Sequence, residues 1–371
     1  MTLRLNLDYK LIGIVAALLG VGLPMVFSAS HLLAYSKFGE AAYFMQRQAL
    51  WIALGCAVMI ACSQIPYAFW RRVSIVAMVF TLFVLVVILA IGVATNGARR
   101  WALDGSFQPS ELAKLVTVIY VGHWLASRKD KLQQITYGLI PFYVIVGGVA
   151  GLVIMQPDLS TGIVIGFTAV AMFFAAGAPI GQLVVSTLAL SGVAGSMLVL
   201  LVQWRMTRLM LFIEPLKHKA DEGYQIYQML LAMGSGGWLG NGFSSLGGTI
   251  GYLPASHTDA IFAVIGNDFG IVGCTLVILL FILFARQGLL IAERAPDAFG
   301  YLLAVGITSW LICQALLNIA STTASIPFTG IPLPFISFGG SALVAALAGV
   351  GVLLNIAQSG RAVRPSRRAS K

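Results

Sequence analysis

Long apolar runs alternate with short polar segments along nearly the whole chain. A membrane-spanning helix needs about 20 mainly apolar residues, and ten stretches fit that template. They lie near residues 10–29, 48–66, 72–94, 109–127, 136–155, 159–178, 181–203, 260–286, 297–320 and 337–357. The pattern therefore predicts an all-α polytopic membrane protein with ten transmembrane helices.

The composition supports lipid as the main solvent of this chain. Of its 371 residues 59% are hydrophobic and only 10% are charged, whereas a soluble domain carries roughly 25% charged residues. The net charge of +10 fits cytoplasmic loops and anionic headgroups better than nucleic acid, because no basic stripe is interleaved with aromatic residues. The composition thus excludes an ordinary soluble protein.

The chain shows no internal repeat, so we expect a single membrane domain over residues 1–371. The first apolar run, Leu11 to Val26, resembles a signal peptide but leads into similar segments, so we interpret it as an uncleaved first helix. The cysteines lie in apolar runs without metal-ligand spacing and are expected to be core residues. We assign no metal ligands.

Basic residues predict the orientation. Ten crossings place both termini on one side, and short loops rich in Lys and Arg favour the cytoplasm. Arg71, Arg72, Arg128 and the basic tail, residues 358–371, then lie inside. The long loop 204–258, between the seventh and eighth helices, is then extracytoplasmic. No nucleotide-binding loop of the Walker type is present.

A charged pair stands just inside the predicted fourth helix. Glu111 and Lys114 are three residues apart and share one face, an arrangement that is unfavourable in a membrane unless the charges pair or meet water. Both a structural ion pair and a cavity wall fit this pattern. Upstream, Arg99 and Arg100 could bind a phosphate or pyrophosphate, or only lipid headgroups.

Further polar residues interrupt the apolar pattern. Asp158 could cap the sixth helix or bind a ligand, and Arg205 and Arg208 share the polar face of an interfacial amphipathic helix. The segment "TGIPLPFISFGGSALVA" cannot form a regular helix because of its prolines. Non-helical backbone at membrane depth must be buried or meet water, so we expect this segment to fold over a cavity.

Five motifs together resemble the SEDS family (shape, elongation, division and sporulation proteins), which polymerises peptidoglycan from lipid II. They occur in the family's order over roughly residues 8 to 357, and the N-terminal part looks more like the division branch, FtsW, than the elongation branch, RodA. The motifs are "NGARRW…QPSELAK", "QPDLST", "EGYQIYQMLLAMGSGGWLGNG", "GYLPASHTDAIFAVIGNDFG" and "GIPLPFISFGGS".

The resemblance implies that Asp259, in "HTD", is the catalytic residue. The family reaction is an inverting transfer: the 4-hydroxyl of the GlcNAc in lipid II attacks the anomeric carbon of the growing chain, and undecaprenyl pyrophosphate leaves. We expect a carboxylate to take the hydroxyl proton and cations to stabilise the leaving group. The expected substrate-binding residues are Arg99, Arg100, Trp101, Gln108, Glu111, Lys114, Gln156, Asp158, Arg205, Arg208, His257, Thr258, Ser337, Gly339, Gly340 and Ser341.

The resemblance also implies partners and a location. We expect a class B penicillin-binding protein as transpeptidase partner, together with other division proteins, at the septum of a bacterial cell membrane. No cofactor is assigned, although a divalent cation (Mg²⁺ or Mn²⁺) could assist. We also expect Asp268 to point away from Asp259, because nine residues are two and a half helical turns.

The sequence departs from the family pattern in several places, and other functions stay open. These departures put in doubt secondary contacts and any site that needs several acids. The departing positions are Ser160, Gly248, Thr249, Ala255, Asn267, Phe338 and Ala342. A lipid II flippase would use the intramembrane charges as a polar path. A non-catalytic scaffold would tolerate change at Asp259, whose side chain would then only cap the eighth helix.

Overall fold

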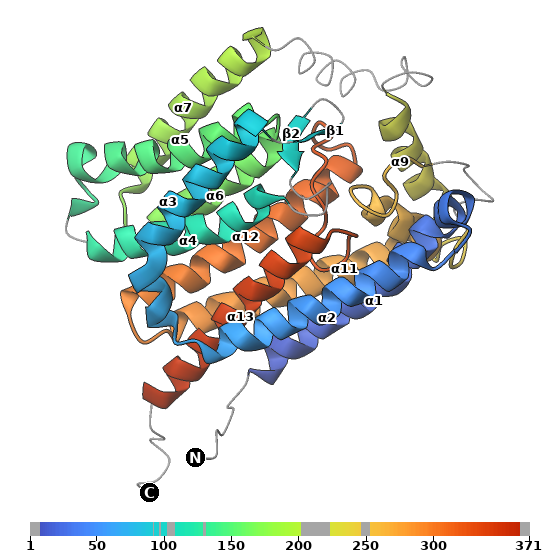
Figure 1. The fold of residues 1–371 in the computed structure, drawn as a ribbon, viewed down its shortest axis with the longest axis horizontal. Coiled ribbons are helices and arrows are strands. Elements are labelled where there is room, and N and C mark those ends of the chain that lie inside the picture. Colours follow the sequence, from blue (N-terminus) through green and yellow to red (C-terminus); the bar gives the residue numbers. More distant parts are fainter. Residues whose placement is uncertain are drawn as a thin grey trace, which may run out of the picture.

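The protein is described by a computed structural model over residues 8–91, 93–95, 98–101, 108–128, 131–201, 223–245 and 253–363. Within these residues nearly all regular structure is helical (Figure 1). The helices are α1 (Tyr9–Phe38), α2 (Tyr43–Gln64), α3 (Tyr67–Ile91), α4 (Pro109–Ser127), the π-helix η2 (Ile135–Leu139), α5 (Ile140–Met155), α6 (Leu159–Ala175), α7 (Ile180–Leu201), α9 (Tyr224–Ser235), α11 (Ile261–Glu293), α12 (Ala298–Thr322) and α13 (Gly340–Val363).

Seven helical segments of the described chain are long and apolar enough to cross a membrane. They are α1, α2, α3, η2 with α5, α11, α12 and α13. The helix α6 and the first part of α7 are apolar but shorter, and α4 carries the Glu111–Lys114 pair. Each of the ten predicted stretches is thus mainly helical, while ten crossings stay a prediction.

A short antiparallel hairpin departs from the helical pattern. Strand β1 (Val93–Thr95) pairs with β2 (Ala98–Trp101), so the predicted third helix ends earlier than residue 94. The sequence contains the signals for this hairpin, because Val93 and Thr95 are β-branched and Asn-Gly follows them. Its arginines, Arg99 and Arg100, are therefore carried on a strand.

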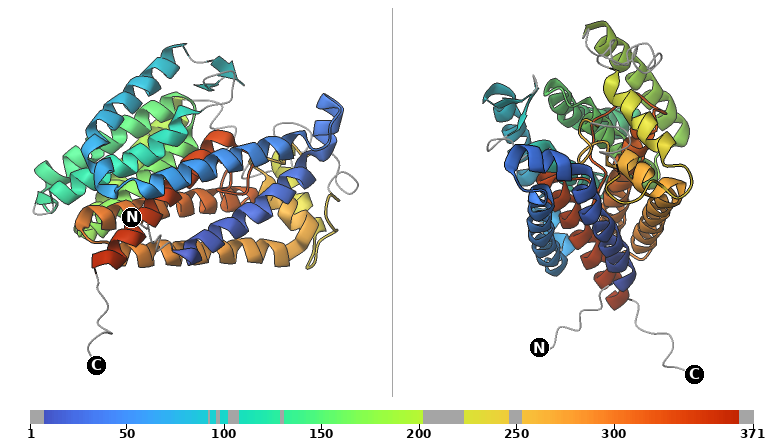
Figure 2. Two further views of the ribbon diagram at one scale, coloured as in Figure 1. Left: turned by 60° about the horizontal axis from the view of Figure 1, so that its bottom comes forward. Right: turned by 90° about the vertical axis from the view of Figure 1, so that its right-hand side faces the viewer.

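The helix α12 lies between two groups of helices. Figures 1 and 2 show α1, α2, α11 and α13 packed together on one side of the bundle, with α3 to α6 on the other. Consistent with this central place, α12 buries large side chains such as Phe299 and Trp310. Polar groups on α12 can therefore reach both halves of the molecule.

Helices α2 and α13 pack closely because small residues lie between them. A Cβ on Gly351 would lie 2.4 Å from the carbonyl oxygen of Met59, and a Cβ on Gly55 would lie 2.5 Å from Leu347. At the start of α13, Gly340 packs against the Trp51 ring, with 2.3 Å to the nearest ring atom from an ideal Cβ. Small residues allow such close helix contacts in membranes, and here they place the first turns of α2 beside the Gly339-Gly340 turn.

Helix α11 is interrupted at Gly270, whose φ of 61° and ψ of −156° are not helical. The turn after α9 fills the gap in its hydrogen-bond ladder: Asn241 donates its backbone N–H to the carbonyl of Asn267 (2.9 Å), and Ile271 donates to Gly237 (3.0 Å). The buried Asp268 carboxylate accepts from Ser28 and Ser245. Asp268 thus ties α11 to α1 and to this turn.

At the opposite end, the start of α1 is joined to the end of α13. The buried Asp8 caps α1 by accepting from Leu11 N (3.1 Å), and it pairs with Arg361 at 2.8 Å. Figure 2 shows these two helix ends close together. Because α13 continues to Val363, the first six residues of the predicted tail, 358–363, are helical, and 364–371 lie outside the described residues.

Candidate active site

A cavity of about 290 Å³ lies where several loops meet the ends of α2, α4, α6 and α13. Of the residues expected to bind substrate or catalyse, those that line it are Gln108, Glu111, Asp158, Thr258, Asp259, Gly339, Gly340 and Ser341. These residues come from segments up to 233 positions apart, the separation of Gln108 and Ser341. The fold therefore gathers eight of the seventeen expected residues around one cavity.

Asp259 lies in the turn that precedes α11. The helix begins at Ile261 with Ala260 at its N-cap position, so Asp259 lies one residue before the capping position. Its side chain instead faces the loop between α12 and α13: an ideal Cβ on Gly330, where φ is +64°, would lie 3.5 Å from Asp259 Oδ2. The absence of a side chain at 330 leaves room beside this carboxylate.

The proline-rich loop before α13 satisfies part of its backbone through its own Ser337 and through the turn before α11. Ser337 Oγ accepts from Leu333 N (2.8 Å) and donates to the carbonyl of Thr258 (2.6 Å), while Phe338 N donates to the carbonyl of His257 (2.9 Å). These bonds explain how non-helical backbone is tolerated here. Ser337 is buried, so it supports the cavity wall from behind.

Asp158 caps α6, one of the two roles that the sequence left open, and it also lines the cavity. Its Oδ1 accepts from Thr161 N at 3.1 Å, which makes it the N-cap of α6. Its Oδ2 accepts from Gln108 Nε2 (3.0 Å), and Gln108 N donates to Ser341 Oγ (3.1 Å). This carboxylate therefore both caps a helix and lines the cavity.

Glu111 and Lys114 form an ion pair of 2.8 Å with almost no exposure to solvent. Lys114 Nζ also donates to Gln314 Oε1 (2.7 Å), and Gln314 Nε2 donates to the carbonyl of Pro332 (3.0 Å). Glu111 lines the cavity, whereas Lys114 lies behind it. The pair thus joins α4 to α12 through Gln314, and Glu111 also forms part of the cavity wall.

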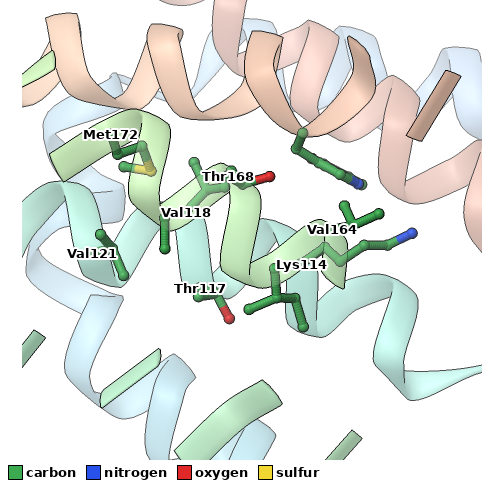
Figure 3. A pocket seen from close by; sticks show the side chains of 10 residues that line it. Lys114, Thr117, Val118, Val121, Val164, Thr168 and Met172 are labelled. Atoms are coloured by element: carbon green, nitrogen blue, oxygen red, sulfur yellow. The ribbon is translucent and has the colours of Figure 1, made fainter. Parts of the chain in front are cut away.

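The stem of Lys114 borders a second, very small cavity of about 10 Å³ between α4 and α6. Figure 3 shows the Lys114 nitrogen directed away from Val121 and Met172, which line the far part of this space. A volume of this size holds about one water molecule. This second cavity is a packing gap and offers no room for a substrate.

Two expected site residues lie away from the 290 Å³ cavity. Gln156 is buried and donates to the carbonyl of Leu85 (2.8 Å), so it joins α5 to α3. His257 packs against the rings of Phe44 and Phe338, at centroid distances of 4.6 and 5.7 Å. Burial, aided by the charge of Lys37, lowers the pKa of His257 to about 4, so its ring is neutral near pH 7.

Five expected residues cannot be placed at the cavity. Arg99, Arg100 and Trp101 belong to β2, and only their backbone is described. Arg205 and Arg208 lie outside the described residues.

The structure adds Arg47 and Asn318, which the sequence did not single out. Arg47 of α2 lines the cavity, with its guanidinium carbon 5.4 Å from the centre of the Tyr43 ring; it is the basic side chain among the described lining residues. Asn318 of α12 donates to the backbone of Asp259 at 2.8 Å. The sequence signal for Arg47 is a charge beside an apolar run.

The acids of the cavity do not form a close metal-binding set. Among the described residues, no group of three His, Cys, Asp or Glu side chains is placed to hold a metal ion. Glu111 is paired with Lys114 and Asp158 caps α6, so both carboxylates are engaged by protein groups. The assisting divalent cation therefore stays a prediction.

These features define a polytopic membrane protein with an acid-lined cavity at one end of its helical bundle. The profile of the family described as cell cycle protein, named for FtsW, RodA and SpoVE, matches residues 9–362. The chain belongs to this family, which confirms its predicted place among the SEDS proteins.

Individual relatives match over nearly the whole chain. Stage V sporulation protein E of Bacillus subtilis is 38% identical over 365 residues, 97% of this chain and 99% of that protein. FtsW of Geobacter sulfurreducens, named a probable peptidoglycan glycosyltransferase, is 37% identical over 354 residues, 94% of each protein.

Solved structures show the same fold. The crystal structure of Thermus thermophilus rod shape determining protein RodA matches with a TM-score of 0.71 and 25% identity, over 96% of this chain and 98% of that chain. A chain in a structure described as a peptidoglycan synthase complex that coordinates polymerization and crosslinking matches with a TM-score of 0.82 and 24% identity, over the same shares.

Proposed function

We propose that this protein is a peptidoglycan glycosyltransferase that polymerises lipid II, with Asp259 as its catalytic base. The observation that carries this proposal is the position of Asp259 at a cavity shared with Arg47, in a chain whose relatives include a probable peptidoglycan glycosyltransferase. A carboxylate suits a hydroxyl nucleophile, and a guanidinium suits a phosphate leaving group.

In the proposed reaction, the 4-hydroxyl oxygen of the lipid II GlcNAc attacks the anomeric carbon of the growing chain with inversion. The hydroxyl proton passes to the Asp259 carboxylate as the new C–O bond forms. The bond from the anomeric carbon to the pyrophosphate oxygen breaks, and undecaprenyl pyrophosphate leaves with the electron pair. Arg47 stabilises the developing negative charge, assisted by Arg99, Arg100, Arg205 and Arg208.

The size of the cavity limits what enters it. At about 290 Å³ it lies at the lower end of the range for small-molecule sites, roughly 300–1,000 Å³. A cavity of this size cannot hold a lipid-linked glycan, so the lipid tail and most of the glycan extend along the surface.

The membrane arrangement completes the proposal. Ten helices cross the bilayer, both termini are cytoplasmic, and the cavity and the loop 204–258 face outward, where lipid II is polymerised. A class B penicillin-binding protein crosslinks the product. The similarity to FtsW favours a role at the division septum.

A flippase is the second candidate, because Glu111, Lys114 and Asp158 are all buried charges. Reconstitution in vesicles with labelled lipid II in one leaflet distinguishes the two functions. The polymerase consumes lipid II in the leaflet that its cavity faces and releases undecaprenyl pyrophosphate. Movement of intact lipid II between leaflets, without glycan, would favour the flippase, and neither activity would favour a scaffold.

A further inference from the structure

The buried side chain of Asn318 joins two walls of the cavity. It lies on α12 and has no exposure to solvent. Its Nδ2 donates to the carbonyl of Asp259 (2.8 Å) and to the carbonyl of Ile331 (2.7 Å). These carbonyls belong to the turn before α11 and to the loop before α13, which otherwise meet through Ser337 and Phe338.

Both hydrogen atoms of the Asn318 amide are used. A carboxamide nitrogen has two donors, and the two acceptors here are backbone carbonyls, which fix the orientation of the amide. No hydroxyl, aliphatic side chain or carboxylate of the same size can supply two donors at this place. The requirement is therefore specific to a carboxamide.

The bridge sets the position of the Asp259 carboxylate relative to the loop. Ile331 follows Gly330, the residue that leaves room beside Asp259 Oδ2. One turn earlier on α12, Gln314 holds the next carbonyl, that of Pro332, at 3.0 Å. The carbonyls of Ile331 and Pro332 are thus fixed to one rigid helix. The Asn318 amide that binds the first of them also binds the carbonyl of Asp259.

We propose that Asn318 is a positioning residue for Asp259, which holds the base at the distance from the reacting hydroxyl that proton transfer needs. This inference rests on the proposed glycosyltransferase function. Asn318 does not line the cavity, so its loss affects the chemical step more than substrate binding. A misplacement of about 1 Å can reduce a rate on the order of 100-fold.

The test compares the full-length wild type with Asn318→Leu, Asn318→Asp and the control Thr308→Val. The Leu variant removes both donors at similar volume, and the Asp variant keeps the shape but has at most one donor. Thr308 is also buried on α12, and within the described part of the chain its hydroxyl donates to the carbonyl of Ala304 in its own helix (2.8 Å). We expect kcat to fall about 10- to 100-fold in both Asn318 variants, with KM for lipid II near wild type and with melting temperatures that are lowered but stay above the assay temperature.

A second measurement does not depend on activity. In an Asp259→Cys background, the rate at which a hydrophilic thiol reagent modifies Cys at 259 reports its position at the cavity. We expect Asn318→Leu to change this rate several-fold and Thr308→Val to leave it unchanged. The labelling test remains valid if the wild type makes no glycan, a result that would count against the proposed function alone.

Three results would overturn the inference. Wild-type kcat in either folded Asn318 variant would show that the bridge is not needed. An unchanged labelling rate would show that residue 259 does not move. Failure of both Asn318 variants to fold would assign Asn318 a purely structural role.

Discussion

The polar residues around the cavity act mainly by holding one another in place. Ser337 and Asn318 support the backbone on either side of Asp259, and Asp158 is held by Gln108 and by the first turn of α6. Buried polar networks of this kind are favourable only when every member is satisfied. Substitution of one supporting residue should therefore affect both stability and the chemistry at Asp259.

The ion pair of Glu111 and Lys114 predicts that the effects of their substitutions on stability are not additive. Because both charges are buried, Glu111→Gln or Lys114→Met alone leaves one uncompensated charge, at a cost of roughly 3–5 kcal/mol. The double variant removes both charges and should lose less stability than the sum of the two. Thermal unfolding in detergent measures this, and additive losses would show that the charges are independent.

His257 predicts a dependence of stability on pH. Its pKa is lowered from 6.5 to about 4 by burial and by Lys37, so the unfolded chain binds a proton between these values that the folded chain does not. The folded state therefore has its full stability above about pH 6.5 and loses stability as the pH falls towards 4. At pH 5 the loss is about 2 kcal/mol.

Melting temperatures at pH 7 and pH 5 check this expectation. The wild type should lose more stability on acidification than His257→Gln, which cannot titrate at this position. Equal losses in the two proteins would place the acid sensitivity at another group.

Sequence patterns predicted more of the fold than of the site. Long apolar runs mark helices without reference to tertiary contacts, whereas Asn318 and Gln314 look ordinary within such a run because their partners are distant: Lys114 lies 200 positions from Gln314. Asp259 was found through its motif. Gln156 has a motif position too, yet it satisfies a carbonyl of α3, a use that no local pattern reveals.

At the scale of elements, the interruption in α11 depends on close backbone contact with the turn after α9. A Cβ on Gly236 would lie 1.9 Å from the carbonyl oxygen of Gly266, and a Cβ on Gly240, where φ is +85°, would lie 2.1 Å from that of Asp268. Only glycine permits this approach without movement of the backbone. The contact fixes α9 and its turn to α11 two turns beyond Asp259.

We expect Gly236→Ala and Gly240→Ala to lower the melting temperature, because the added methyl group must displace backbone. Gly234→Ala is the matched control: Gly234 lies in α9, no described residue comes within 4 Å of its ideal Cβ, and alanine favours a helix over glycine by about 1 kcal/mol. Equal effects of all three substitutions would mean that the close contact does not exist in solution.

At the scale of the whole molecule, the start of α1 and the end of α13 are fixed together by Asp8 and Arg361. The cavity lies at the other end of the bundle, near Arg47 in the first turns of α2 and near the preceding turn, which contains the exposed Glu40. The proposed topology therefore places Glu40 outside the cell and Arg294, at the end of α11, inside.

Cysteine labelling tests this topology. A membrane-impermeant thiol reagent applied to intact cells should modify Glu40→Cys but should modify Arg294→Cys only after the membrane is permeabilised. The wild type, whose cysteines are buried or half-buried, serves as the control. The reverse pattern would invert the orientation and place the cavity in the cytoplasm.

The most direct test of the account is polymerisation of purified lipid II by the reconstituted protein, with and without its penicillin-binding partner, analysed as glycan ladders on a gel. We expect ladders from the wild type and a loss of roughly 100- to 10,000-fold in rate for Asp259→Asn, with an unchanged melting temperature. Equal ladders from both proteins would contradict the assignment of Asp259, and no ladders from the wild type with a bound partner would contradict the transferase itself.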